Sequence, residues 1–313
     1  MQKTTKTKPI KKHTVRYDKW GYFFLAPFFI VYIIFSLIPL ISTFFNSLFE
    51  NYRVGLMTVG PNYIGFANFT KVFQSDILRY TWNTIFVWII GFVPQIFISL
   101  LLSVWFTNTE LHLKWQQFFK TVIYMPNLIM AAAFSMLFFT LFSPDGPVNI
   151  LFSNTLKWYP EHIRFFTSVG WTRALIAVMN FLMWYGNTTI MLMAGIMGID
   201  NSLFEAARID GASPLQIFFK ITIPMLLPIF VYVLITSLIG GIQMFDVPQI
   251  LTNGTGNPNR TAMTIIMYLN ANLASKNYGM GGAISVLTFI VTAILSGVVY
   301  KITMAQYANK ERI

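Results

Sequence analysis

Six stretches of the chain contain no Asp, Glu, Lys or Arg and are long enough to cross a membrane. They span residues 22–49, 82–109, 121–144, 174–199, 221–245 and 277–300. The shortest has 24 residues, and a helix of that length extends about 36 Å, more than a hydrocarbon core of about 30 Å. Because backbone groups in lipid must be satisfied within the segment, helices are favoured. The pattern predicts an all-α membrane protein with six transmembrane helices.

Composition agrees with the bilayer as the main solvent of this chain. Hydrophobic residues make up 55% of the 313 residues and charged residues 11%, whereas an average soluble domain has about 25% charged residues. Few soluble folds could bury that much apolar surface.

The distribution of Lys and Arg predicts the orientation of the spans. Seven of the 22 Lys and Arg residues lie in residues 1–20, directly before the first span. If both termini are cytoplasmic, 14 of the 22 lie on the inner side, as the positive-inside rule favours. This predicts a basic cytoplasmic segment over 1–20, a six-span domain over 21–303 and a cytoplasmic tail over 304–313.

The charge distribution and the Cys and His content argue against a nucleic-acid partner and against a metal site. The net charge of +11 could suggest nucleic acid, but attraction of a basic segment to anionic lipid beside a span explains it better. Cysteine is absent, and the three histidines, His13, His112 and His162, are far apart in the chain. We therefore expect no nucleic-acid partner and no metal site.

The segment between the fourth and fifth spans has its own helix signals. Ser202 and Glu205 form an S-x-x-E pattern, typical of a capping box, which predicts a short helix over about 203–210. Gly211 can adopt the left-handed conformation that ends such a helix. Ser213 and the proline that follows it then predict a second helix start. With both termini inside, this helix-turn-helix is cytoplasmic.

The second of these helices is amphipathic, and two interpretations stay open. Its one-sided stripe at i, i+3, i+4 and i+7 consists of Leu215, Phe218, Phe219 and Thr222. A helix lying on lipid would explain the stripe. It would not explain a capped, alanine-rich, acidic first helix, for which docking to another protein is the stronger interpretation.

This segment resembles the cytoplasmic docking loop of the membrane subunits of ATP-binding-cassette (ABC) importers. Their loop reads E-A-A-x-x-x-G, nine residues and then I-x-L-P. The matching residues here are Glu205, Ala206, Ala207 and Gly211, followed after nine residues by Ile221 and Pro224. Asp210 fits the carbohydrate-type version, E-A-A-x-x-D-G-A, and Ile223 stands where Leu is usual.

The resemblance extends over most of the chain and is to the MalF/UgpA-like carbohydrate uptake permeases. Leu25 and Pro27 are similar to the opening of their first span. The run over 251–254 is similar to their L-T-x-G-G-P segment, although Thr255 and Gly256 depart from it. The resemblance thus implies a sugar permease, most simply for an oligosaccharide, in the bacterial plasma membrane.

The resemblance also implies how such a permease is driven. The loop over 200–224 would be a coupling helix seated on an ATPase, in which Glu205 forms a salt bridge, Ala206 and Ala207 pack closely, and Gly211 makes the turn. Asp210 would also be one of the ATPase-coupling residues. Two ABC ATPase subunits would bind ATP and Mg, so no cofactor is expected in this chain. The further partners implied are a second, homologous but non-identical permease and an extracellular solute-binding lipoprotein or periplasmic protein.

Neutral polar residues inside the spans suggest where a substrate passes. Asn180, Trp184 and Asn187 share one helix face at i, i+4 and i+7, and amides beside an aromatic ring suit a polyhydroxyl ligand. Polar residues also hold membrane helices together, which we favour for Ser and Thr and leave open for the two asparagines. The resemblance tilts Asn180 toward substrate, because these permeases place binding residues on the helix before the loop. The weaker candidates are Met183, Trp184, Gln243 and Met244.

Missing motifs narrow the function class. The chain contains no GxxxxGK[ST], no HExxH and no carboxylate pair within a span, so we expect a transport subunit without ATPase or other enzyme activity. The alternative is an ion-coupled secondary carrier for a neutral solute. Such carriers usually hold ionisable groups at membrane depth, and here Asp246, at the end of a span, is the one candidate.

Overall fold

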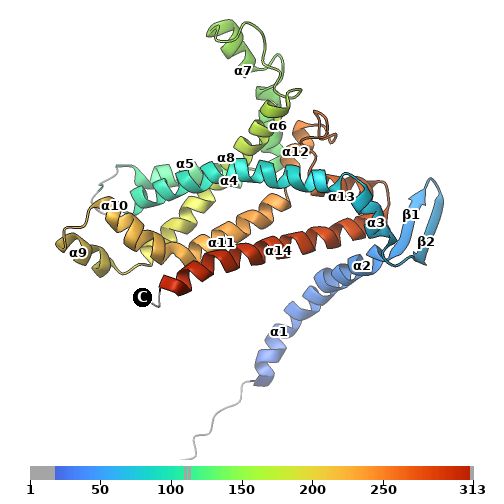
Figure 1. Cartoon of the computed structure of the whole chain (residues 1–313), viewed down its shortest axis with the longest axis horizontal. Coiled ribbons are helices and arrows are strands. Elements are labelled where there is room, and N and C mark those ends of the chain that lie inside the picture. Colours follow the sequence, from blue (N-terminus) through green and yellow to red (C-terminus); the bar gives the residue numbers. More distant parts are fainter. Residues whose placement is uncertain (1–17, 109–110, 112–113, 311–313) are drawn as a thin grey trace, which may run out of the picture.

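The computed structural model describes residues 18–108, 111 and 114–310, and most of them are helical (Figure 1). Five stretches in this part of the chain are long and apolar enough to cross a membrane. They are Lys19–Ser47, Ile77–Thr107, Val169–Met197, Pro214–Leu251 and Tyr278–Met304. Five of the six predicted spans are therefore confirmed as helices of spanning length. Nearly all of the basic segment predicted over 1–20 lies outside the described residues, as does the end of the predicted tail.

Three of these stretches are single helices, and two contain a π-helical turn. The single helices are α4 (Ile77–Thr107), α8 (Val169–Met197) and α14 (Tyr278–Lys310). The first stretch comprises α1 (Asp18–Tyr32), η1 (Ile33–Leu37) and α2 (Ile38–Ser47). The fourth comprises α10 (Pro214–Ile217), η3 (Phe218–Thr222), α11 (Ile223–Ile242) and α12 (Asp246–Leu251).

Each π-turn lies directly before a proline at the second position of the next helix. These prolines are Pro39 in α2 and Pro224 in α11. Proline lacks an N–H and its ring clashes with the carbonyl four residues earlier, and the wider π-turn relieves this conflict. The chain therefore stays helical through Pro224, so the second predicted surface helix and the fifth span are one continuous element.

The third predicted span is a broken element. It consists of α5 (Gln116–Leu128) and α6 (Ala131–Leu141), which meet at an angle of 93°. Pro126 and Asn127, two poor helix formers, directly precede the break. The apolar run over 121–144 is therefore helical as predicted, but it turns sharply within its length.

The connection between the first two spans forms a β-hairpin that the sequence did not predict. Strands β1 (Phe49–Val54) and β2 (Met57–Tyr63) are antiparallel. Helix α3 (Ala67–Gln74) follows, and the buried Asn68 amide on it donates to the carbonyls of Ser47 and Phe49 at 3.0 and 2.9 Å. This hairpin lies at the opposite end of the bundle from α9 (Asn201–Ile209) and the C-terminus (Figure 1). The remaining elements are α7 (Pro147–Asn149), η2 (Ile150–Thr155) and α13 (Ile265–Ala274).

Small and polar residues let α4 and α8 approach closely. A Cβ on Gly91 of α4 would lie 2.8 Å from the carbonyl oxygen of Ala177 on α8. Ser99 Oγ on α4 donates to the Tyr185 carbonyl on α8 at 2.9 Å. Such contacts are typical of membrane helix pairs, and the role of helix glue predicted for serine is confirmed for Ser99.

Candidate functional site

Helix α9 begins at an aspartate cap and not at the predicted serine. Asp200 is the N-cap, and its Oδ1 accepts a hydrogen bond of 2.9 Å from the Ser202 N–H. This bond lowers the pKa of the Asp200 carboxyl. The capping box predicted between Ser202 and Glu205 is wrong, because aspartate caps helices as well as serine does and the helix starts two residues earlier.

The end of α9 follows the prediction closely. Gly211 has φ +74°, in the left-handed region that glycine adopts at little cost. Its N–H donates to the Arg208 carbonyl at 3.0 Å, and the Ala212 N–H donates to the Ala207 carbonyl at 2.9 Å. These two bonds form a Schellman motif, so Gly211 turns the chain from α9 toward α10.

Helix α10 starts with a complete capping box. Ser213 Oγ accepts from the Gln216 N–H at 3.3 Å, and Gln216 Oε1 accepts from the Ser213 N–H at 2.8 Å. Pro214 occupies the first helical position. The predicted serine cap and proline start are confirmed. The reciprocal role of Gln216 was missed, although S-x-x-Q is a visible signal.

The helix pair α9–α10 is fixed in shape and open on its surface. None of the residues of α9 is buried. Glu205, Ala206 and Asp210 are exposed, and Ala207 is half-buried. Ile209 on the same short helix is 86% exposed.

The turn between these helices provides a first test. Gly211→Ala places a Cβ in the left-handed region, which should destabilise the local structure by about 1 kcal/mol. We expect faster amide hydrogen exchange over α9 in the purified chain. Gly198→Ala, at φ −82° at the end of α8, is the matched control and should leave this exchange unchanged. Equal protection in both variants would contradict the role given to Gly211.

A cavity of about 170 Å³ lies among α4, α8 and α11. Four predicted substrate residues line it, namely Asn180, Trp184, Asn187 and Met244. On the α4 side, Gln95 Nε2 donates to Thr188 Oγ1 at 2.7 Å. The structure therefore brings the two asparagines and the tryptophan of α8 to one cavity, as their helical spacing predicted.

The two asparagines differ in the hydrogen bonds that their side-chain amides already make. Asn180 Nδ2 donates to the Ile176 carbonyl at 2.9 Å and lies 3.5 Å from Met244 Sδ. The Asn187 amide has no hydrogen-bond partner among the described residues. An amide left unpaired at membrane depth is costly unless water or a ligand pairs with it. Asn187 is thus the more available of the two.

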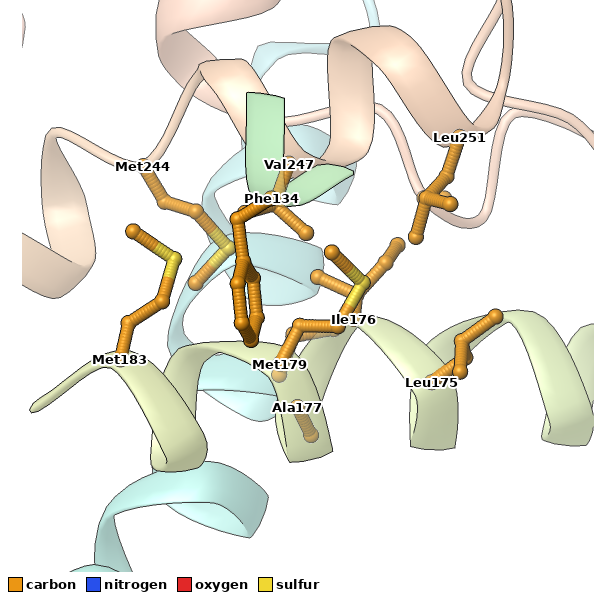
Figure 2. Packing of buried hydrophobic residues seen from close by; sticks show 11 residues of the cluster. Phe134, Leu175, Ile176, Ala177, Met179, Met183, Met244, Val247 and Leu251 are labelled. Carbon is orange, nitrogen blue, oxygen red and sulfur yellow. The ribbon is translucent and has the colours of Figure 1, made fainter. Parts of the chain in front are cut away.

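Two other candidates lie away from the cavity surface. Met183 is buried in a hydrophobic cluster, and Figure 2 shows it beside Phe134 and Met244. Gln243 is exposed at the end of α11, and neither residue is part of the cavity wall. Most of the cluster's α8 residues, from Leu175 to Met179, precede Asn180, so apolar side chains adjoin the cavity on the side away from α9.

The cavity also contains aromatic residues that the sequence did not single out. They are Trp88 and Phe92 on α4 and Tyr232 on α11. Both helices are apolar on nearly all sides, so hydrophobic periodicity does not mark the face that meets the cavity. Within the described residues, no three His, Asp or Glu side chains come together as metal ligands do.

The comparisons with known proteins agree with this architecture. Residues 82–312 match the family described as "Binding-protein-dependent transport system inner membrane component". The lactose transport system permease protein LacF of Rhizobium radiobacter is 29% identical over 99% of both chains. The arabinooligosaccharides transport system permease protein AraP of Bacillus subtilis is 29% identical, over 90% of this chain and 88% of its own.

Among solved structures, a chain of a bacterial alginate ABC transporter, in complex with an alginate pentasaccharide-bound periplasmic protein, has the same fold. The TM-score is 0.74 at 23% identity, and the match covers 93% of this chain and 96% of that chain. The chain described here belongs to the family of binding-protein-dependent transport system inner membrane components.

Proposed function

We propose that this chain is the permease subunit of an ABC importer that carries a sugar, most simply an oligosaccharide, across the bacterial plasma membrane. The observation that carries the proposal is the exposed, capped helix pair α9–α10 with its E-A-A-x-x-D-G-A sequence. A short rigid projection at one end of a membrane bundle, with acidic and small residues exposed, suits docking into a groove of another protein.

The helix pair would transmit force from a separate ATPase that binds ATP and Mg. Glu205 would form a salt bridge to that subunit, and Ala206 and Ala207 would allow close approach of its backbone. Asp210 and Gly211 would hold the turn, so that a push on α9 passes through α10 into the continuous helix of the fifth span. A projection joined rigidly to a span moves that span when the projection moves.

The position of the helix pair supports a cytoplasmic location for the C-terminal end of α14. It lies at the same end as the C-terminus, and the hairpin with α3 lies at the other end (Figure 1). The extracellular solute-binding protein would then dock at the hairpin end. A second, homologous permease would cover the side of α11 that carries Tyr232, which is 57% exposed, together with the exposed Thr236 and Gly240.

The cavity supports a sugar as the transported solute. Its wall combines the Asn187 amide, which has no hydrogen-bond partner in the described part of the chain, with the Asn180 amide, which makes one bond to a carbonyl, and the ring of Trp184. Amides pair with hydroxyl groups, and aromatic rings pack on the C–H faces of sugars. The names of the relatives refer to lactose, arabinooligosaccharides and trehalose/maltose, which are all of this chemical class.

The test of sugar transport uses the complete assembly, with its ATPase and binding protein, in liposomes. Asn180→Ala and Asn187→Ala should each lower sugar uptake about tenfold, since each removes a hydrogen bond to a hydroxyl group. Assembly and basal ATP hydrolysis should stay unchanged. Asn272→Ala, on α13 outside the cavity, is the control. Normal uptake by both cavity variants would move the substrate site elsewhere.

The same assay separates this proposal from an ion-coupled carrier. Uptake should stop when ATP is omitted and continue when proton and sodium gradients are collapsed. Uptake that follows the ion gradient without ATP would replace the proposed function with the carrier.

A further inference from the structure

Trp88 on α4 lies where the cavity adjoins two hydrophobic clusters, the one that contains Met183 and a second that contains Val72, Leu238 and Ile284. It lines the cavity and packs against both clusters. Its ring stacks on Phe92, with centroids 5.2 Å apart and planes at 18°. Its Nε1–H donates to Ser237 Oγ on α11 at 3.1 Å. The indole is therefore fixed from two helices before any solute arrives.

The close approach of Trp88 to α11 depends on a glycine. A Cβ on Gly241 would lie 2.1 Å from Trp88 Cδ1 and 2.4 Å from Cγ, far inside the contact distance of two carbon atoms. A side chain at this position would displace the indole from α11. It would also separate Nε1 from the hydroxyl of Ser237, one turn earlier on the same helix.

We propose that Trp88 is a substrate-binding residue that stacks on a sugar ring, and that Gly241 and Ser237 are the residues that position it. The proposal rests on the sugar-permease function above. Its chemistry follows from the hydrogen bond to Ser237, which occupies the one donor of the indole. Trp88 can then contact a solute only through its apolar ring, which matches the C–H face of a sugar and not its hydroxyl groups.

The cavity thereby has aromatic rings on two helices, Trp88 on α4 and Trp184 on α8, with the asparagine amides on α8. Rings recognise the faces of a sugar and amides recognise its edge. Because a fixed aromatic side chain loses little freedom on binding, its contribution appears as affinity. Trp88 should therefore select for ring sugars and act mainly on KM.

The test measures uptake of lactose, maltose and arabinotriose by the full assembly in liposomes, and titrates the sugar that the wild-type assembly transports best. Trp88→Leu should raise KM about tenfold, with little change in kcat. Trp88→Phe should raise KM less, because it keeps a ring. Gly241→Ala should resemble Trp88→Leu, and Ser237→Ala should show a smaller rise.

Gly297→Ala on α14 is the matched control, because a Cβ there meets nothing within 4 Å. A wild-type KM in Trp88→Leu for all three sugars would overturn the proposal. If Trp88→Leu does not assemble, Trp88→Phe and Ser237→Ala decide, and an unchanged KM in both would overturn it equally. A wild-type assembly that takes up none of the three sugars would overturn the sugar-permease function and this inference together.

Discussion

Replacing Glu205 by lysine is expected to abolish ATP-driven uptake while the chain stays folded in the membrane. Glu205 is exposed on a helix without buried residues, so the fold does not depend on its charge. At the interface with the ATPase, the substitution would replace an attractive contact with a repulsive one. Losing a buried interfacial charge pair typically weakens binding by at least about thirtyfold, and reversing the charge should weaken it further.

The measurement is co-purification of the ATPase with the permease, together with uptake in liposomes. Glu161→Lys makes the same charge change at an exposed glutamate far from α9 in the chain, and it should leave both readouts intact. Glu205→Gln should fall between the two, because it keeps the shape and removes the charge. Wild-type uptake by Glu205→Lys would remove the docking role from α9.

The helix pair was predictable because single residues determine where its helices start and end. The prediction failed where two possible N-cap residues lie close together. Gly211 and Ser213 each have one conformation or partner that suits them, and each occupies it. At the start of α9, Asp200 and Ser202 are both good caps two residues apart. The sequence does not show which of the two residues caps the helix. The prediction was therefore wrong about the first residue of α9 and right that a helix forms there.

For the spans too, the sequence predicted which segments are spanning helices but not where a helix bends. Apolar length identified the five spanning stretches in the described part of the chain, because lipid admits few other structures. Hydropathy carries no information on the path of a helix, so the 93° turn between α5 and α6 was not predictable from it. The hairpin β1–β2 was missed for another reason, since its strands are mixed in polarity and lack a strict alternation.

The candidate site was predictable where polar residues stand out from an apolar helix. Asn180 and Asn187 are seven residues apart and meet the same cavity. Met183 lies three residues after Asn180 and so near the same helix face, yet it packs into the hydrophobic cluster and not against the cavity, which helical spacing alone does not predict. Trp88 gave no such signal, because its role depends on Gly241, which is distant in sequence and close in space.

Replacing Gly186 by alanine is expected to destabilise the whole bundle. A Cβ at this position on α8 would lie 2.0 Å from the Ile123 carbonyl oxygen and 2.9 Å from Tyr124 Cα, both in the backbone of α5. No rotamer change can relieve a clash between two backbones, so the helices must separate. The hydrogen bond of 3.1 Å from Asn127 Nδ2 on α5 to the Met183 carbonyl on α8 would be lost with that movement.

Two effects of opposite sign compete in this substitution, and their sizes decide the outcome. Alanine favours an α-helix over glycine by up to about 1 kcal/mol, whereas overpacking costs about 1–3 kcal/mol or more and the lost hydrogen bond about 1 kcal/mol. The midpoint of thermal unfolding in detergent should therefore fall by about 5 °C. Gly170→Ala, on the same helix with nothing within 4 Å of its Cβ, has only the favourable effect and should unfold at or above the wild-type temperature. A Gly186→Ala variant as stable as Gly170→Ala would mean that α5 and α8 do not pack at this glycine in the membrane.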